Sequence, residues 1–465
     1  MPTIGRSPYT TTAPLHDYDA LVHEDRAHRL IYTDPAIFAA EMTHIFGATW
    51  VYLAHESEIA NDNDFITRRM GLRPLIILRD ANGQIRALYN RCTHRGTTLC
   101  RFEKGNARSF QCPYHGWNFA NTGQLRGVPW PDGYATDLRD PQLHGNKYNV
   151  AQVPRVESYR GFIFGTLNMA APSLVEHLGP ITKPIDEWLD RNPGGKIVVC
   201  EANRIKYKGN WKLAYDNSCD GYHVVYSHRS LLEMENRFTG DNPDDKSKGM
   251  SFYRNSPDSL AMYMRYTGNG CHFKDKRPNL EKRPGGLWAI ESAHPGMEHY
   301  QAEFERRYGD RAPALLDLAG SEPVNINVFP NFSLLGNHIQ VFEPVSVNET
   351  NAVWYGTRIV DANGDLGCDA VRDINALRMR TQEGFPNFGE VDDVANFEQI
   401  QKGLDCIEDE WVYMNRGLGI PGRIKTEADG SITAPATDEA FMREHLGHWK
   451  RLMQATPKLT IKREP

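Results

Sequence analysis

The chain has 465 residues, with 53 lysines and arginines against 59 aspartates and glutamates, a formal net charge of −6. Such a length gives a prior of two or three domains with full hydrophobic cores. The mild charge gives no electrostatic reason to expect nucleic acid or an anionic membrane as a partner. No apolar run approaches the ~20 residues that span a bilayer, and residues 1–12 lack a signal-peptide pattern, so we expect a cytoplasmic protein.

The first predicted element is a helix over residues 35–46. Thr33 and Asp34 can cap its start, Pro35 suits its first position and Gly47 can end it. We expect residues 1–44 to form a helical segment that packs on the catalytic part of the chain.

The next part of the chain, residues 45–167, is predicted to be a small all-β domain. Short apolar runs rich in β-branched and aromatic residues alternate with turn residues. One hairpin is expected around the turn Asp80–Gly83, and another turn at residues 121–123.

Two half-motifs fall on loops of this β domain. They are Cys92-Thr93-His94 and, after seventeen intervening residues, Cys112-Pro113-Tyr114-His115. Each half offers one thiolate and one imidazole, a set that holds a two-iron cluster and raises its reduction potential above that of an all-cysteine cluster. A Cys2His2 zinc site is the alternative. Zinc fingers usually pair Cys with Cys and His with His, so the mixed halves favour the cluster.

The remaining six cysteines carry no such pattern. They are spread thinly along the chain, unlike a disulfide framework. We expect them to be small buried hydrophobic residues: Cys100, Cys200, Cys219, Cys271, Cys368 and Cys406.

Residues 168–465 show mixed elements and are interpreted as one catalytic domain. Residues 235–300 are rich in Gly, Pro, Asn and Lys, which predicts long loops over a pocket. We expect helices over residues 181–191, 212–234, 372–380, 396–417 and 437–453, and strands over residues 197–207, 325–329, 332–342 and 352–360.

A second metal motif combines His223 and His228 with a carboxylate. Two imidazoles and one carboxylate leave open positions on iron(II) for oxygen and substrate. Asp393 is the expected ligand; Asp220 competes, but its better use is to accept the second N–H of His223. Asp220 and His223 would share a helix face, whereas the five-residue step to His228 requires a distorted helix or a metal near its end. Two structural histidines are the alternative for such a pair in isolation.

These motifs, together with Asn210-Trp211-Lys212, resemble the α subunits of Rieske non-haem iron aromatic-ring-hydroxylating oxygenases over about residues 40–420. The resemblance implies an α+β fold: an all-β Rieske [2Fe-2S] domain, and a catalytic domain with a long antiparallel β-sheet covered by helices. It implies α3 or α3β3 trimers, in which Asp220 connects His115 of one subunit to His223 of the next. The spacing from Asn217 to His223 is more similar to the benzoate, toluate, anthranilate and aniline branch.

The implied activity is that of a terminal oxygenase, in which O2 and NAD(P)H electrons serve to hydroxylate an aromatic ring during aromatic-hydrocarbon catabolism. We expect cis-dihydroxylation of an aromatic acid such as a benzoate. The alternatives are a Rieske monooxygenase, acting by salicylate-type hydroxylation or demethylation, and a dioxygenase of neutral or polycyclic arenes.

We identify no dinucleotide-binding fingerprint, which favours a separate ferredoxin or flavin reductase; a small β subunit is a further candidate partner. Asn217 is predicted to hydrogen-bond near the iron, with capping or backbone bonding as the alternative.

Overall fold

The computed structural model describes residues 16–190, 194–229, 262–267, 269–275, 302, 305–312, 325–335, 338–360 and 388–463. The chain forms two compact units. The first unit contains Ala40–Glu176 and Ala455–Pro465, and the second contains Ala13–Ala39 and His177–Gln454. The domain limits predicted from the sequence, after residues 44 and 167, stay predictions.

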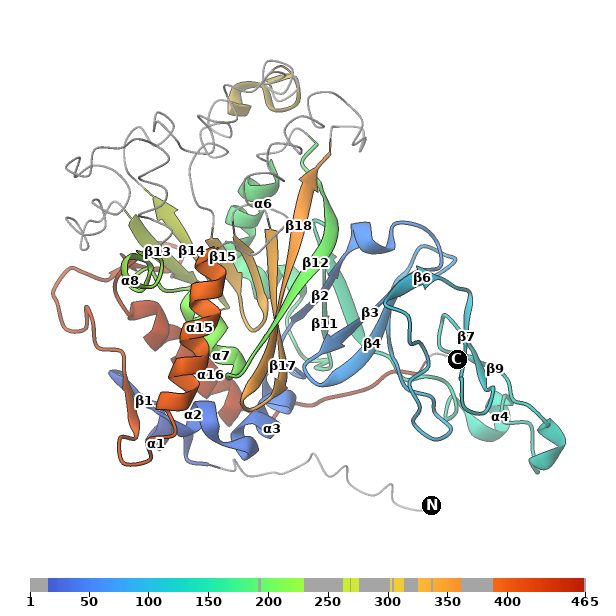
Figure 1. Ribbon diagram of the computed structural model, residues 1–465. Coiled ribbons are helices and arrows are strands. Elements are labelled where there is room, and N and C mark those ends of the chain that lie inside the picture. The colour runs from blue at the N-terminus through green and yellow to red at the C-terminus, as the bar shows by residue number, and fades with distance from the viewer. Residues whose placement is uncertain are drawn as a thin grey trace. The chain divides into compact units, whose positions relative to one another are not determined.

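The first unit is built from three antiparallel sheets, so its predicted all-β character is confirmed (Figure 1). A four-stranded sheet has the order β5-β4-β3-β6, with Ile85–Tyr89, Arg73–Arg79, Asp64–Met70 and Lys104–Asn106. Two three-stranded sheets contain β7-β8-β9 (Ser109–Gln111, Asn118–Ala120, Leu125–Gly127) and β10-β11-β2 (Arg155–Tyr159, Phe162–Thr166, Val51–His55). Short helical turns are η1 (Glu56–Ile59), η2 (Pro131–Gly133), α4 (Pro141–His144) and α5 (Leu174–Leu178), the last of which runs into the second unit.

The predicted hairpin between β4 and β5 is confirmed. The backbone N–H of Gly83 donates to the carbonyl of Asp80 at 3.0 Å, and Gly83 has a φ of 77°, which favours glycine. The buried Asp80 carboxylate accepts from Arg86 at 2.8 Å, so the turn is tied to the strand that follows it.

One hydrophobic core runs from the sheets of the first unit to the motif loops. Phe65, Ile76 and Leu88 from the four-stranded sheet belong to the same buried cluster as Cys92 and Cys112. The two cysteines are therefore positioned by a packed core and not only by their loops.

The second unit contains a nine-stranded antiparallel sheet (Figure 1). Its order is β12-β18-β17-β16-β15-β14-β13-β21-β20. In that order the strands are Ile197–Tyr207, Glu349–Ile359, His338–Ser346, Phe332–Leu335, Asn325–Val328, Gly270–Asp275, Met262–Thr267, Ile432–Pro435 and Lys425–Thr426. A separate pair joins β1 (Arg26–His28) to β19 (Trp411–Tyr413).

Helices pack against this sheet. α7 (Trp211–Ser218) contacts β15, β17 and β18, α15 (Phe388–Gly403) contacts α7 and β12, and α16 (Ala440–Gln454) contacts β13. The other helical segments are α1 (Tyr18–Leu21), α2 (Leu30–Thr33), η3 (Gly179–Ile181), α6 (Thr182–Asp190), α8 (Val224–Ser227) and η5 (Gly309–Arg311). The predicted early helix is α3 (Pro35–His44), which runs from the second unit into the first. The predicted sheet covered by helices is confirmed, and the fold class is α+β.

Some predicted elements are wrong in extent. The strand predicted over residues 332–342 is two strands, because Phe332–Leu335 (β16) pairs antiparallel with the start of β17 at His338. The helix predicted over residues 396–417 begins at Phe388 and ends at Gly403, a residue type that is common at helix C-termini. Met262–Thr267 and Gly270–Asp275 form the paired antiparallel strands β13 and β14 and not loops. The helix predicted over residues 372–380, and most of residues 235–300, lie outside the described residues.

The expectation that the six unassigned cysteines are buried is only partly correct. Cys100, Cys219 and Cys271 are buried, whereas Cys200 is half-buried and Cys406 is exposed. Cys368 lies outside the described residues. Within the part of the chain that the structure describes, no helix is long and apolar enough to cross a membrane.

Buried His177 predicts a loss of stability in acid. Burial lowers the pKa of His177 to about 4 from its ordinary value of 6.5. Below pH 6.5 the unfolded chain therefore binds a proton that the folded chain does not, so stability falls as the pH falls towards 4. At pH 5 this difference amounts to about 2 kcal/mol. His177→Leu, measured by urea unfolding at pH 5 and pH 7.5, is expected to be less acid-sensitive than the wild type by that amount; equal sensitivity would contradict this assignment.

Candidate metal centres

The two half-motifs of the first unit lie on loops with the same backbone hydrogen bonds. The N–H of Gly96 donates to the carbonyl of Cys92, and the N–H of Gly116 to that of Cys112, both at 3.0 Å. Gly96 and Gly116 have φ angles of 83° and 71°, a conformation that glycine adopts without strain. The first loop follows β5, and the second connects β7 with β8. Two matching loops thus present one cysteine and one histidine each.

The four predicted cluster ligands are brought together. The rings of His94 and His115 lie 4.8 Å apart between centroids, and the thiols of Cys92 and Cys112 are close enough to interact. The His94 ring is stacked on the buried Trp117 ring at 4.7 Å, and its Nδ1 is buried without a hydrogen-bond partner among the described residues.

The cysteines of this group lie in the protein interior, and the histidines lie nearer the surface. Cys92 and Cys112 are 1% and 2% exposed, whereas His94 and His115 are half-buried. Burial raises the pKa of the Cys92 thiol, and the nearby Cys112 adds to the effect. A bound metal would replace these protons. The donors fit a two-iron cluster whose histidine side is turned towards the surface.

The second motif follows helix α7 of the second unit. Asn210 caps this helix: its side-chain oxygen accepts from the N–H of Lys212 at 3.1 Å. Its amide donates to the carbonyls of Tyr32 and Val347 at 3.1 and 2.9 Å, and Asn210 is fully buried. One side chain therefore fixes the start of the helix to two other segments of the unit.

Replacement of Asn210 by alanine is expected to lower the free energy of unfolding by about 3 kcal/mol, because the cap is lost and the carbonyls of Tyr32 and Val347 lose their donor. Urea unfolding at neutral pH measures this change. The matched control is Asn348→Ala, at an exposed position, which is expected to change the free energy by less than about 0.5 kcal/mol. Equal losses in the two variants would argue against the anchoring role.

The helix predicted across the second motif is interrupted. α7 ends at Ser218, and a separate single turn, α8, covers Val224–Ser227 between the two histidines. Asp220 and His223 therefore do not share a helix face, and the metal motif lies at helix ends. The break is held by packing: the N–H of Gly221 donates to the carbonyl of Ala436 at 3.0 Å, and a Cβ on Gly221 would lie 2.6 Å from that oxygen.

His223, His228 and Asp393 converge at one point. Their ligand atoms all lie within 4.8 Å of one another. The Nε2 atoms of His223 and His228 are 3.3 Å apart, and Asp393 Oδ1 lies 3.7 and 3.4 Å from them. That oxygen is buried and has no hydrogen-bond partner among the described residues. An orphaned carboxylate oxygen between two imidazole nitrogens fits a divalent metal of the two-histidine, one-carboxylate type.

Asp220 is not one of the three converging groups, and it contacts the other ring nitrogen of His223, Nδ1. Asp220 Oδ2 is 3.1 Å from His223 Nδ1, and Asp220 Oδ1 accepts from the N–H of Tyr222 at 2.5 Å. With its Nδ1–H donated to Asp220, His223 turns Nε2 towards the centre. Asp220 thus contacts His223 without joining the three converging groups, which is the arrangement that its expected role requires.

The charges of the three groups are coupled. Burial disfavours the charged form of His223, but the hydrogen bond and charge of Asp220, with Asp393, raise its pKa above the ordinary value. Burial lowers the pKa of His228, against the opposing charge of Asp393. Burial raises the pKa of Asp393, against the two histidines and a hydrogen bond from Asn217. A cation at the centre would favour the neutral imidazoles and the ionised carboxylate.

Two asparagines that the sequence analysis did not single out support the motif. Asn325 and Asn327, on strand β15, donate to the carbonyl of Ser218 at 2.6 and 3.0 Å. They fix the end of α7 immediately before Asp220. Their spacing of two residues in an otherwise apolar strand is the signal that marks them as neighbours on one face.

The expectation that the chain has no dinucleotide fingerprint is wrong for the glycine spacing alone, because one segment carries that spacing. Gly417, Gly419 and Gly422 match Gly-x-Gly-x-x-Gly, yet the three-residue strand before them pairs antiparallel with β1, and strands β20 and β21 come before the next helix, α16. A dinucleotide site needs a strand–turn–helix unit with the phosphate at the helix start. A Cβ on Gly417 would lie 2.3 Å from Asp438 Oδ2, so close packing explains this glycine.

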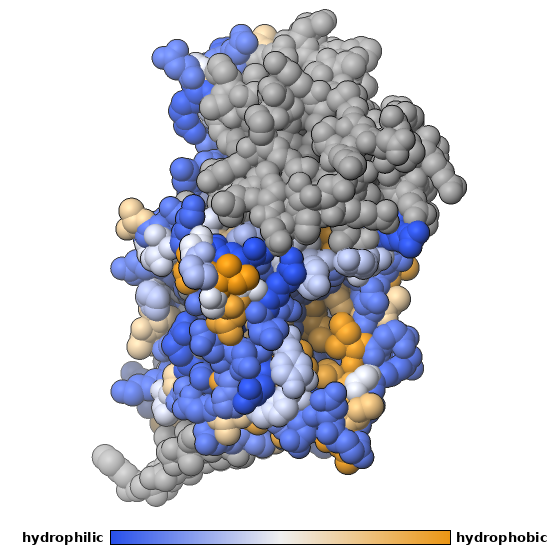
Figure 2. All heavy atoms as spheres, turned by 90° about the vertical axis from the view of Figure 1, so that its left-hand side faces the viewer, coloured by the Kyte–Doolittle hydropathy of each residue, from blue (hydrophilic) through white to orange (hydrophobic). Residues whose placement is uncertain are grey.

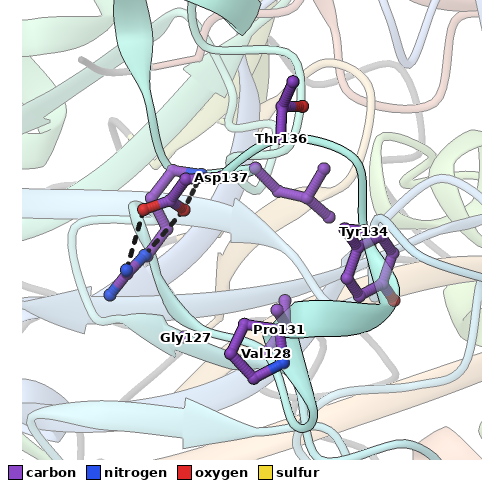
Figure 3. Close-up of a pocket in the computed structure, with 8 residues that line it drawn as sticks. Gly127, Val128, Pro131, Tyr134, Thr136 and Asp137 are labelled. Carbon is purple, nitrogen blue, oxygen red and sulfur yellow. Dashed lines mark hydrogen bonds and ion pairs between the residues drawn. The ribbon is translucent and has the colours of Figure 1, made fainter.

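A small hollow lies in the first unit, and Figure 3 shows it. None of the predicted site residues lines it. Tyr134 and Thr136 stand on its wall, and Asp137 pairs with Arg139 at 2.8 Å at its edge. We assign no role to this hollow.

Comparison with known proteins identifies both units. Residues 49–154 match the Rieske [2Fe-2S] domain family, and residues 195–454 match the ring hydroxylating alpha subunit (catalytic domain) family. The chain is 31% identical to the 2-halobenzoate 1,2-dioxygenase large subunit of Burkholderia cepacia, covering 84% of this chain and 80% of that protein. It is 30% identical to the anthranilate 1,2-dioxygenase large subunit of Acinetobacter baylyi, covering 92% and 89%. The structure of naphthalene 1,2-dioxygenase from Rhodococcus sp. bound to indole is similar, with a TM-score of 0.70, 27% identity, and 92% and 94% coverage.

Proposed function

The chain belongs to the α subunits of ring-hydroxylating oxygenases that carry a Rieske [2Fe-2S] domain, and on that premise we propose that it dihydroxylates an aromatic acid such as a benzoate. As a member it is the terminal oxygenase component, and its two domains imply a Rieske cluster and a mononuclear iron. The convergence of His223, His228 and Asp393 is the observation that carries the oxygenase assignment. The preference for an aromatic acid is supported by the names of the two relatives, a 2-halobenzoate and an anthranilate dioxygenase.

We propose that Cys92, His94, Cys112 and His115 hold the cluster, and that His223, His228 and Asp393 hold the iron. When bound, the cluster supplies electrons one at a time and the iron supplies oxygen activation. Asp220 keeps the proton of His223 on Nδ1 and its Nε2 free for the metal. Asn217, through its hydrogen bond, holds the Asp393 carboxyl in place. Three protein ligands would leave coordination positions on the iron open.

A neighbouring subunit is proposed to cover the motif of the second unit. Tyr222, Tyr226 and Val391, each within two residues of a proposed ligand, are 42%, 76% and 51% exposed. Figure 2 shows apolar patches among mainly polar side chains on the side of the molecule where α8 and α15 lie. Exposed apolar groups beside a functional site favour an interface. We propose an α3 or α3β3 assembly, which light scattering of the purified protein, with and without a small subunit, will test.

Electrons are proposed to come from NAD(P)H through a separate ferredoxin or reductase. The glycine-rich segment Gly417–Gly422 follows an antiparallel strand and does not lead directly into a helix, unlike a dinucleotide site.

The test is a substrate screen with iron-loaded protein, a surrogate reductase, NADH and isotopically heavy oxygen gas. Benzoate, salicylate, anthranilate, phthalates and small arenes are followed by mass spectrometry. Two heavy oxygen atoms in a benzoate-type product are the expected result. One heavy atom would replace the proposal with a monooxygenase, and labelled product from neutral arenes alone would overturn the acid preference.

A further inference from the structure

Two buried cysteines meet beneath the second metal motif. Cys219 is the residue that follows α7, and Cys271 lies on strand β14, 52 positions later in the chain. Their sulfur atoms are 2.7 Å apart, and the residues are 0% and 1% exposed. Non-bonded carbon atoms pack at roughly 3.5–4.0 Å, whereas the sulfurs of a disulfide lie about 2.05 Å apart. The two thiols are thus held closer than ordinary packing neighbours.

The surroundings of the pair hold both sulfurs in place. Asn327, on the strand next to β14, directs its amide to Cys271 Sγ at 3.7 Å and to the carbonyl of Ser218 at 3.0 Å. The same side chain therefore fixes one cysteine and the residue before the other. The hydroxyl of the buried Tyr215 makes a hydrogen bond with the side chain of Cys219. Little movement of the backbone is needed to join the sulfurs.

The cysteine pair lies directly before the loop that carries Asp220 and His223. Cys219 immediately precedes Asp220, whose carboxylate is 3.1 Å from His223 Nδ1. A bond between Cys219 and Cys271 would attach the start of this loop covalently to the central sheet.

We propose that Cys219 and Cys271 form a redox-active dithiol, which oxidises to a disulfide and so locks the loop that carries Asp220 and His223. This property is separate from the proposed substrate and does not depend on it. Disulfides in proteins of reducing compartments are usually transient and redox-sensing.

The oxidation balances with hydrogen peroxide, the two-electron reduction product of dioxygen. Peroxide converts one thiol to a sulfenic acid and releases water; the second thiol then attacks that sulfur, the S–O bond breaks, and a second water leaves as the disulfide forms. Both sulfurs together lose two electrons, which reduce the peroxide. Burial raises the pKa of the Cys219 thiol, so we expect the first step to be slow and to require a small, neutral oxidant.

The first experiment detects the bond in the full-length, metal-loaded wild-type protein. The protein is treated with hydrogen peroxide, free thiols are alkylated, and peptides are analysed without reduction. A peptide pair joined through Cys219 and Cys271, lighter than the two thiol peptides by two hydrogen atoms and separated by dithiothreitol, is expected. Exposed Cys406 reports that oxidant was present. If Cys406 is oxidised while Cys219 and Cys271 remain fully alkylated, the proposal is overturned.

Variants then test whether the bond locks the loop. Peroxide is expected to raise the thermal midpoint of the wild type by several degrees, and dithiothreitol is expected to reverse the rise. Cys271→Ala is expected to show no such rise, whereas the control Cys406→Ala, which leaves the pair intact, is expected to keep it. An equal rise in Cys271→Ala and the wild type would overturn the locking role, and the peptide analysis needs no variant that might misfold.

Discussion

Replacement of Asp393 by alanine is expected to remove the mononuclear iron and to abolish hydroxylation while leaving the Rieske cluster in place. Asp393 Oδ1 is the single buried carboxylate oxygen, among the described residues, that lies within 4 Å of both histidine Nε2 atoms. Without it, two imidazoles remain, a set with too few donors to hold iron firmly. We expect the loss of activity to exceed the roughly 10–100-fold typical of a residue that only supports a ligand.

Iron analysis after desalting, and the absorption spectrum of the cluster, measure the two metals separately. The expected result is a loss of iron with an unchanged cluster spectrum, since the cluster ligands belong to the other unit. Asp392→Asn is the matched control. Asp392 Oδ2 lies 4.0 Å from His228 Nδ1, whereas Asp393 Oδ1 lies 3.4 Å from His228 Nε2, the nitrogen that faces the other proposed ligands. Asp392→Asn is expected to keep iron and most of its turnover. Full iron content in Asp393→Ala, with iron loss in Asp392→Asn, would transfer the ligand role to Asp392.

The sequence was sufficient to predict the site wherever local spacing decides the geometry. The two Cys-and-His loops are short, and each is closed by its own backbone hydrogen bond, from Gly96 to Cys92 and from Gly116 to Cys112. The spacing of the residues in the sequence therefore largely determines how these loops place their side chains. Asp393 was also predicted, although it is far from His223 in the chain, because an acidic pair near the start of a helix is a recognisable feature. The resemblance to a family supplied the rest of that inference.

Residues whose role depends on tertiary packing were not predictable. Asn325 and Asn327 appear in the sequence only as polar positions in a strand, and their bonds to Ser218 exist because that strand lies under the end of α7. The place of the break between α7 and α8 was not predicted. The five-residue step from His223 to His228 indicated only a distorted helix or a metal near a helix end, whereas the break depends on the close approach of Gly221 to Ala436. Cys219 and Cys271 were expected to be inert for the same reason: their contact joins a helix to a strand 52 positions away.

Asp220→Asn is expected to keep both metals and to lose coupled turnover by about 10–100-fold or more. Asparagine retains the size of aspartate and one oxygen acceptor, so the loop and the metal ligands are expected to persist. It removes the negative charge that raises the pKa of His223 and favours Nδ1–H donation. The family resemblance implies that Asp220 also connects His115 of one subunit to His223 of the next. In that case the same change slows electron transfer from the cluster to the iron.

The two roles of Asp220 make different kinetic predictions. A residue that only orients His223 affects iron affinity and substrate hydroxylation, but not the rate at which a reduced cluster is reoxidised. A residue on the electron path slows that reoxidation even when iron is fully bound. Rapid mixing of the reduced, iron-loaded variant with oxygen and substrate measures the cluster spectrum directly. Slow reoxidation with full iron content supports the path, and wild-type reoxidation with poor product yield supports orientation alone. Normal product formation would remove Asp220 from the mechanism, because its hydrogen bond to His223 would then be structural.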